Sequence, residues 1–216
     1  MKRLFFLLIL TLAASTTTAF AATLNVSSWH LWAGSQTLTK AQCTLSGTSS
    51  TTDAYVDAQS TGTSFGSGTT LLVSPKSGKE QWAFVRFDLS SCNIPAATGG
   101  ADSATLTLTI TTAPGSSRTI DVTTVGSTWN GSLTWTGAQS LSYGGSLPSF
   151  TTGTTSGVTR SVNVTADVDA LIRNGSASFG WRLSEASSSA NVTTTFGSSE
   201  NGTAGNRPQL VINYVK

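Results

Sequence analysis

Aromatic side chains are the residues of this sequence best suited to bind a ligand. The chain has 216 residues and six tryptophans, and Trp129, Trp135 and Tyr143 lie in a stretch rich in Gly, Ser and Thr. A flat ring can stack on the apolar face of a sugar, and nearby hydroxyl groups can supply polar contacts that fix its orientation. The same rings could instead anchor a long loop to the core. We therefore expect either carbohydrate contacts or loop packing at these three positions.

Catalysis has little support in the sequence. His30 is the single histidine, and no Gly-x-Ser-x-Gly turn stands between an expected strand and a helix. A glycosidase needs two carboxylates that face each other across a cleft, and the sequence singles out no such pair. We expect a protein that is not an enzyme and has no catalytic residues.

The N-terminal residues have the pattern of a secretory signal peptide. Lys2 and Arg3 precede an apolar run over 4–14 that is too short to span a bilayer, and Ala19 and Ala21 provide the small residues of a cleavage site. Residues 1–21 are therefore expected to be removed, and the mature protein to be secreted and extracellular without membrane insertion.

Loss of the signal peptide also changes the charge. Lys2 and Arg3 leave with it, which takes the formal net charge of +2 to zero. Nucleic-acid binding needs clustered basic residues that neutralise phosphates, so we expect no nucleic-acid partner. A chain without net charge lacks long-range repulsion between copies, and this favours self-association.

The two cysteines predict a disulfide. In an oxidising compartment two cysteines usually pair. Cys43 and Cys92 would close a loop of about 50 residues, which stabilises a fold by about 3–4 kcal/mol in the chain-entropy model. Free thiols or a bond between two molecules are the alternatives.

These residues must be positioned mainly by strands, because apolar and polar residues alternate with period two through most of the chain. In the segment 81–89, Val85 and Phe87 share one face, and Trp82, Phe84 and Arg86 share the other. A helix is expected near 166–174 with Thr165 as its N-cap. Strands are expected at 53–57, 69–73, 81–89, 103–112, 118–125, 177–184, 191–197 and 208–215.

This pattern predicts an all-β fold, a two-sheet antiparallel β-sandwich of jelly-roll type with one short helix. The stretch 127–155 is expected to mix short strands with long surface loops. Residues 22–52 form an N-terminal extension in which 23–27 alternates like an edge strand, and residues 53–216 form the sandwich domain.

Several short motifs resemble the disaggregatase-related (DNRLRE) domain family. The clearest are the acidic-aromatic strand Asp53-Ala54-Tyr55-Val56 and the sequence Arg86-Phe87-Asp88-Leu89. Two further motifs are Phe196 with Glu200 and the pair Arg207-Pro208. The resemblance implies a secreted β-sandwich module classed among carbohydrate-binding modules. The family pattern also has a tryptophan near Trp129 and near Trp135.

A structural calcium ion is the one cofactor that we consider. Ca²⁺ takes six to eight oxygen ligands, and Asp53, Asp57 and Glu200 fall at matching ends of the family pattern. The alternative is that these carboxylates form turn hydrogen bonds or pair with Arg86 or Arg207. For Arg86 we expect a structural role, with its guanidinium against Asp53 or Glu200.

Together these observations predict a secreted, non-catalytic module that binds polysaccharide or a glycan-bearing cell surface. The alternative is a structural subunit of an extracellular matrix or filament. It would assemble through β-edge contacts, in which a strand of the extension is donated to a neighbouring copy.

Overall fold

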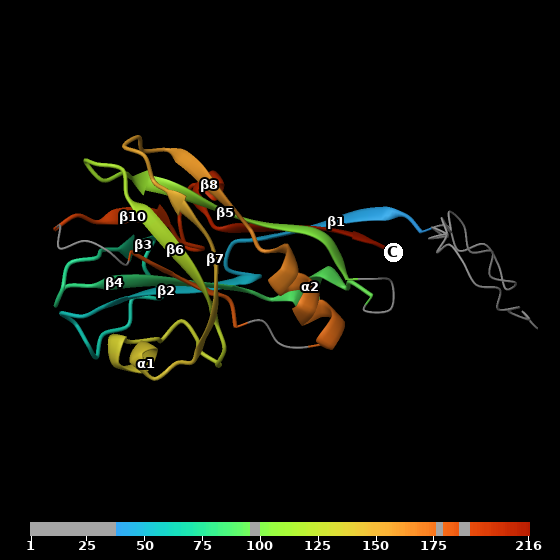
Figure 1. The fold of residues 1–216 in the computed structure, drawn as a ribbon, viewed down its shortest axis with the longest axis horizontal. Helices are drawn as coiled ribbons and strands as arrows, with labels where there is room; N and C mark the ends of the chain where they lie inside the picture. Colours follow the sequence, from blue (N-terminus) through green and yellow to red (C-terminus); the bar gives the residue numbers. More distant parts are fainter. Residues whose placement is uncertain (1–37, 96–99, 176–178, 186–190) are drawn as a thin grey trace, which may run out of the picture. The chain divides into compact units, whose positions relative to one another are not determined.

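A computed structural model describes residues 38–95, 100–175, 179–185 and 191–216 (Figure 1). The expected signal peptide and the expected strand at 23–27 lie outside these residues. Within the described part of the chain, no helix is both long and apolar enough to cross a membrane.

The described residues form two antiparallel sheets packed face to face (Figure 1). The six-stranded sheet contains β1 (Lys40–Ser46), β11 (Gln209–Val215), β5 (Ala101–Thr112), β10 (Thr194–Gly197) and β3 (Thr70–Val73) in that order, with β8 (Val158–Asn163) paired to β5. The five-stranded sheet has the order β2 (Thr51–Asp57), β4 (Gln81–Phe87), β9 (Trp181–Ser184), β6 (Thr119–Val125) and β7 (Tyr143–Thr151). The predicted all-β sandwich is confirmed.

The strand pairs are nested. β1 pairs with β11, β3 with β10, β4 with β9, β5 with β8 and β6 with β7, all antiparallel. Early strands therefore lie beside late ones, as in a jelly roll. Between the sheets lies an apolar core that includes the fully buried side chains of Phe87, Trp181 and Phe196.

Two helices accompany the sheets: α1 (Trp135–Gln139) beside β2 and α2 (Thr165–Asn174) beside β5 (Figure 1). The expected helix near 166–174 is α2, which ends at Gly175 in the left-handed conformation. Thr165 is not its N-cap, because Val164 occupies that position. The Thr165 hydroxyl instead accepts the backbone N–H of Ala104 at 2.9 Å, which ties α2 to β5.

The sandwich also includes elements that the sequence pattern did not single out. β1 lies upstream of Asp53 and pairs along its whole length with β11, from Lys40 opposite Val215 to Ser46 opposite Gln209. Within the Gly- and Ser-rich stretch, α1 and β7 are formed, and β8 follows. These segments have weak periodicity, and neighbouring strands supply the partners that hold them in place.

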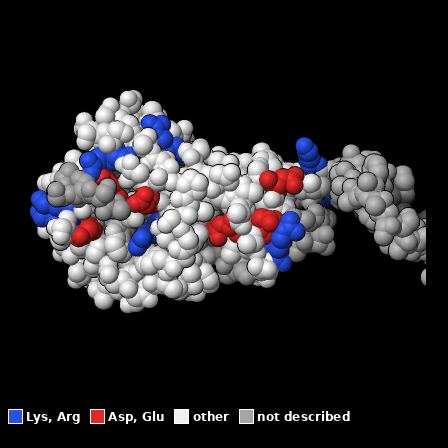
Figure 2. Space-filling view, in the orientation of Figure 1, with Lys and Arg blue, Asp and Glu red and all other residues white. Residues whose placement is uncertain are grey.

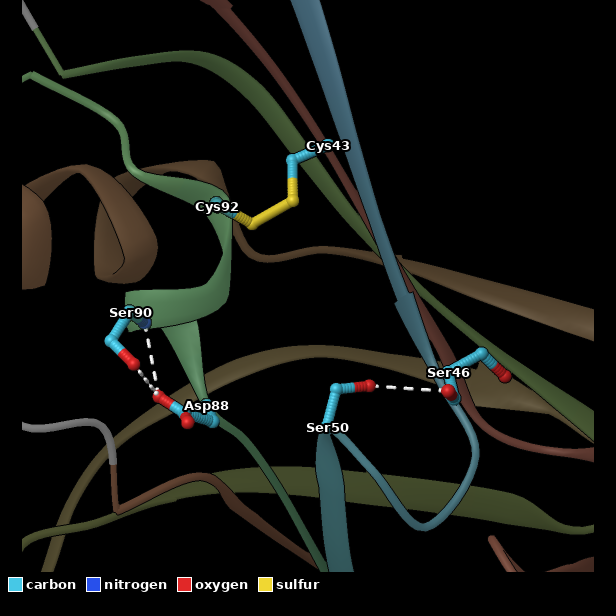
Figure 3. The surroundings of a disulfide bond; sticks show 6 residues. All are labelled: Cys43, Ser46, Ser50, Asp88, Ser90 and Cys92. Atoms are coloured by element: carbon cyan, nitrogen blue, oxygen red, sulfur yellow. Dashed lines mark hydrogen bonds between the residues drawn. A yellow bond between two sulfur atoms is a disulfide. The ribbon is translucent and has the colours of Figure 1, made fainter.

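The predicted disulfide between Cys43 and Cys92 is confirmed, with 5.6 Å between the two Cα atoms (Figure 3). It joins β1 to a short 3₁₀ helix, η1 (Leu89–Cys92). Asp88 caps η1, since its carboxylate accepts the N–H of Ser90 at 3.0 Å and the Ser90 hydroxyl at 2.6 Å. These hydrogen bonds lower the pKa of Asp88. The disulfide therefore connects β1, an edge strand of the six-stranded sheet, to the segment that follows β4 of the five-stranded sheet.

Removal of this disulfide should destabilise the fold without changing its topology. The double variant Cys43→Ser/Cys92→Ser is expected to lose about 3 kcal/mol of unfolding free energy, because its unfolded chain is no longer cross-linked. Urea unfolding with and without a thiol reductant measures the effect. The reductant should destabilise the natural protein but leave the variant unchanged. Equal midpoints for all samples would contradict the prediction.

Candidate functional site

The outer face of the five-stranded sheet is covered by residues 126–142. Trp129, Leu133 and Ala138 from this segment pack on Phe84 of β4 and Val56 of β2 to form a second apolar cluster, separate from the core between the sheets. This explains why Phe84 and Val85 are both fully buried although they point to opposite faces of β4. We refer to residues 126–142 as the covering segment.

Trp129 anchors the covering segment. Its side chain is only 4% exposed, and its indole N–H donates a 2.6 Å hydrogen bond to the carbonyl of Phe179. Phe84 meets its ring edge-on at a centroid distance of 5.7 Å, and the Arg86 guanidinium lies 5.5 Å from its centroid. Trp129 thus has a packing role in this structure, one of the two interpretations left open by the sequence.

The expected pairing of Arg86 with Asp53 or Glu200 is wrong. Asp53 lies opposite Val85 in the β2–β4 ladder and faces the space between the sheets, whereas Arg86 lies opposite Thr52 on the outer face. The guanidinium therefore meets Trp129. Arg86 still has a structural environment, but it consists of the Trp129 ring and the charge of the neighbouring Asp88, not of Asp53 or Glu200.

Beside the covering segment, Arg182 of β9 lies between two aromatic rings. Its guanidinium carbon is 4.7 Å from the ring centroid of Trp82 and 4.2 Å from that of Tyr143. Trp135, the first residue of α1, adds a third ring at 4.5 Å from Trp82, with 44° between the ring planes. We call Trp82, Trp135, Tyr143 and Arg182 the aromatic–arginine cluster.

The β-ladder and the covering segment together position this cluster. Arg182 lies opposite Phe84 of β4 and Thr123 of β6, which places its side chain on the outer face, while Trp181 points into the core. The Tyr143 hydroxyl donates a 2.6 Å hydrogen bond to the carbonyl of Ala138 in α1. The cluster therefore depends on both the register of the sheet and the docking of α1.

All four members of the cluster are partly exposed. Burial raises the pKa of the Tyr143 hydroxyl, and the neighbouring Arg182 cation opposes part of that rise. The Nε atom of Arg182 is buried and has no hydrogen-bond partner, and no ion pair within the described part of the chain involves this residue. The arrangement combines ring surfaces with a cation that carries several N–H donors.

Two of the three aromatic residues proposed as sugar contacts, Trp135 and Tyr143, come together here, and Trp129 does not join them. Strand alternation in the sequence already put Trp82 on the face opposite to Val85 and Phe87, although Trp82 was not among the three expected sugar contacts. Arg182 was not predicted; its signal is its place next to Trp181, because neighbouring residues of a strand point to opposite faces.

The three carboxylates expected to bind calcium do not assemble. Asp57 accepts the N–H of Gln59 at 2.7 Å and the side-chain amide of Gln81 at 2.8 Å. Asp53 instead lies beside Glu200, and no group of three His, Cys, Asp or Glu suited to a metal exists in the described ranges. Burial raises the pKa of Asp53 to about 7, and the charge of Glu200 adds to this rise.

A groove of about 820 Å³ lies next to η1. Its lining includes the Ser and Thr residues of 48–52 together with Leu171 and Ile172 of α2. Charged residues are sparse on the face shown in Figure 2, and basic and acidic groups alternate there without forming a basic stripe.

Comparison of the chain with protein-family models and with curated proteins gives no match in either case. The resemblance to the disaggregatase-related family stays a prediction. The inference of function therefore rests on the geometry described above.

The role of Trp129 can be tested by Trp129→Phe. This change keeps an aromatic ring but removes the N–H donor, so the partly buried hydrogen bond to the carbonyl of Phe179 is lost. We expect a loss of about 1–3 kcal/mol in unfolding free energy. Trp135→Phe is the matched control, because the Trp135 indole contacts the ring of Trp82 and the apolar cluster but has no hydrogen bond within the described part of the chain. Urea unfolding that gave equal losses for both variants would contradict an anchoring role for Trp129.

Proposed function

We propose that this protein is a secreted, non-catalytic module that binds polysaccharide or a glycan-bearing surface through the aromatic–arginine cluster. The observation that supports this most is the placement of Arg182 between Trp82 and Tyr143, with Trp135 alongside. Protein sites for sugars combine ring faces that pack on C–H groups with a few polar donors that fix orientation. The signal-peptide pattern supports the extracellular location.

The position of the carboxylates favours binding over hydrolysis. Glycoside hydrolysis needs two carboxyl groups on either side of a bond in an open cleft. Asp53 and Glu200 lie side by side, but Asp53 is only 2% exposed, and Glu200 is partly buried after the end of β10. The aromatic–arginine cluster contains no carboxylate. A module that holds a glycan without cleaving it fits this arrangement.

The proposal predicts that Trp135→Ala and Arg182→Gln each weaken binding to a responsive polysaccharide by about tenfold, equivalent to about 1.4 kcal/mol. The first change removes a ring, and the second removes the charge and some donors. Affinity electrophoresis against neutral and acidic polysaccharides identifies the ligand, and calorimetry with oligosaccharides measures the loss.

Phe65→Leu serves as the control variant, because Phe65 belongs to a different stack, with Tyr55 at a centroid distance of 4.4 Å. It should bind like the natural protein. Near-UV circular dichroism verifies that each variant is folded. If both cluster variants kept full affinity for a polysaccharide that the natural protein binds, the proposed site would be wrong.

A filament subunit is the second candidate function. β1 pairs with β11 on one side and with no other described strand, so its second edge is unpaired within this part of the chain. Unpaired edges accept strands from other copies. The expected donor, within residues 22–35, lies outside the described residues. Electron microscopy of the concentrated mature protein tests this candidate, which requires ordered fibres that disappear when 22–35 is deleted.

A further inference from the structure

Asp53 and Glu200 bring together parts of the chain that belong to different sheets. Asp53 lies in β2 of the five-stranded sheet, and Glu200 follows β10 of the six-stranded sheet. The backbone N–H of Ser199 donates a 2.7 Å hydrogen bond to Oδ2 of Asp53 across a separation of 146 positions. Asp53 and Ser199 are almost completely buried, at 2% and 1% exposed. Any change in charge at this pair is therefore felt at a joint between the sheets.

The segment after β10 is held in place beside Asp53. The Ser198 hydroxyl donates to the carbonyl of Gly68 at 2.7 Å, and the side-chain amide of Asn201 donates to the carbonyl of Thr69 at 3.0 Å. These bonds tie residues 198–201 to the chain just before β3, which is an edge strand of the six-stranded sheet and contacts β2. The Glu200 carboxyl is thus kept next to Asp53.

The two carboxyl groups are bonded to each other. A side-chain hydrogen bond links Asp53 and Glu200. Two ionised carboxylates have no proton to donate, so this bond needs one of the two groups to be protonated. When both are ionised, Oδ1 of Asp53 and Oε2 of Glu200 are buried acceptors without a donor. One proton held by the pair supplies that donor and removes the repulsion between two like charges.

The strands around Asp53 bring no cation to it within the described part of the chain. β3 and β10 contain no titratable residue. On β4, Val85 lies opposite Asp53, and Arg86 lies on the outer face of the sheet. Tyr55, two residues along β2, stacks on another ring. The Nε atom of Arg207 donates to a backbone carbonyl at 2.7 Å.

Glu200 is the charged group that acts on the Asp53 carboxyl. Asp57, on the same strand, accepts the side-chain amide of Gln81 instead, and the ion pairs found in the described ranges do not involve Asp53 or Glu200. Burial raises the pKa of Asp53 to about 7; the N–H of Ser199 opposes this rise, and the charge of Glu200 adds to it. The pair therefore keeps a proton at pH values where an exposed carboxyl has lost it.

We propose that Asp53 and Glu200 share one proton and act as a pH-sensitive clasp between β2 and the segment after β10. While the proton is present, the hydrogen bond between the two carboxyl groups holds these parts of the sandwich together. When the proton is lost, the two charges repel each other and their buried oxygens lack a donor. The clasp does not depend on glycan binding, because neither residue belongs to the aromatic–arginine cluster.

The contribution of the clasp to stability should decrease as the pH rises. An unfolded chain releases the Asp53 proton near the ordinary pKa of 3.8, whereas the folded protein retains it to about 7. Between these two values the native state binds more protons than the unfolded state, so the free energy of unfolding falls with increasing pH. The stabilisation is complete below about pH 4 and is lost as the pH passes about 7.

Asp53→Asn tests the clasp, because an amide can accept the Ser199 N–H and donate to Glu200 but cannot titrate. From pH 5 to pH 8, we expect the melting temperature of the natural mature protein to fall by about 5 °C relative to this variant. Asp57→Asn is the matched control, and its pH dependence should follow that of the natural protein. Thermal unfolding monitored by circular dichroism gives the melting temperatures and shows which variants are folded.

Carbon-13 nuclear magnetic resonance of the natural protein observes the proton directly. The Asp53 carboxyl carbon should titrate near pH 7, and at a distinctly lower pH in Glu200→Gln, where the neighbouring charge is gone and an amide donates to Asp53. This measurement decides the matter even if Asp53→Asn does not fold. A midpoint near pH 4 for Asp53 in the natural protein would overturn the proposal. The same pH dependence of melting in the natural protein and a folded Asp53→Asn variant would also overturn it.

Discussion

The hydrogen bond from the Trp129 indole to the carbonyl of Phe179 holds the covering segment on the outer face of the five-stranded sheet. That face would otherwise present Phe84 and Val56 to water, at a free-energy cost of roughly 2 kcal/mol for each large apolar side chain. The covering segment buries both of them. One sheet therefore packs against apolar groups on both faces, against the other sheet inside and against residues 126–142 outside.

This double burial determines where a ligand can reach the sheet. Trp129 packs on Phe84 and Arg86 of β4, and the aromatic–arginine cluster lies on the same face with residues from β4, β9, β7 and α1. There Arg182 is held between Trp82 and Tyr143 without an ion pair in the described ranges. Burial next to rings weakens the hydration of the guanidinium, so an oxygen-rich ligand can compete for its donors more effectively than at an open surface.

Local patterns in the sequence predicted much of the fold. Period-two alternation located strands such as β4 and β11, although β4 is buried on both faces and not on one as the alternation predicted. Gly175 marked the end of α2. The oxidising compartment implied by the signal-peptide pattern predicted the Cys43–Cys92 bond, although β1 itself was not predicted. The β-sandwich fold could be predicted from the sequence because the inward-facing residues of its strands alternate regularly with outward-facing ones.

The site was less predictable because it depends on which distant segments meet. Trp82 and Tyr143 are separated by 61 positions in the numbering, and only the strand order brings Arg182 between them. Trp129 and Trp135 have similar surroundings in the sequence, yet Trp129 anchors the covering segment and Trp135 belongs to the aromatic–arginine cluster.

The central claim is tested most directly by titration of the isotope-labelled protein with an oligosaccharide that it binds. The indole N–H signals of the tryptophans are followed in nuclear magnetic resonance spectra. The account predicts large shifts for Trp82 and Trp135 and small ones for Trp129 and Trp181. Shifts confined to other tryptophans would contradict it.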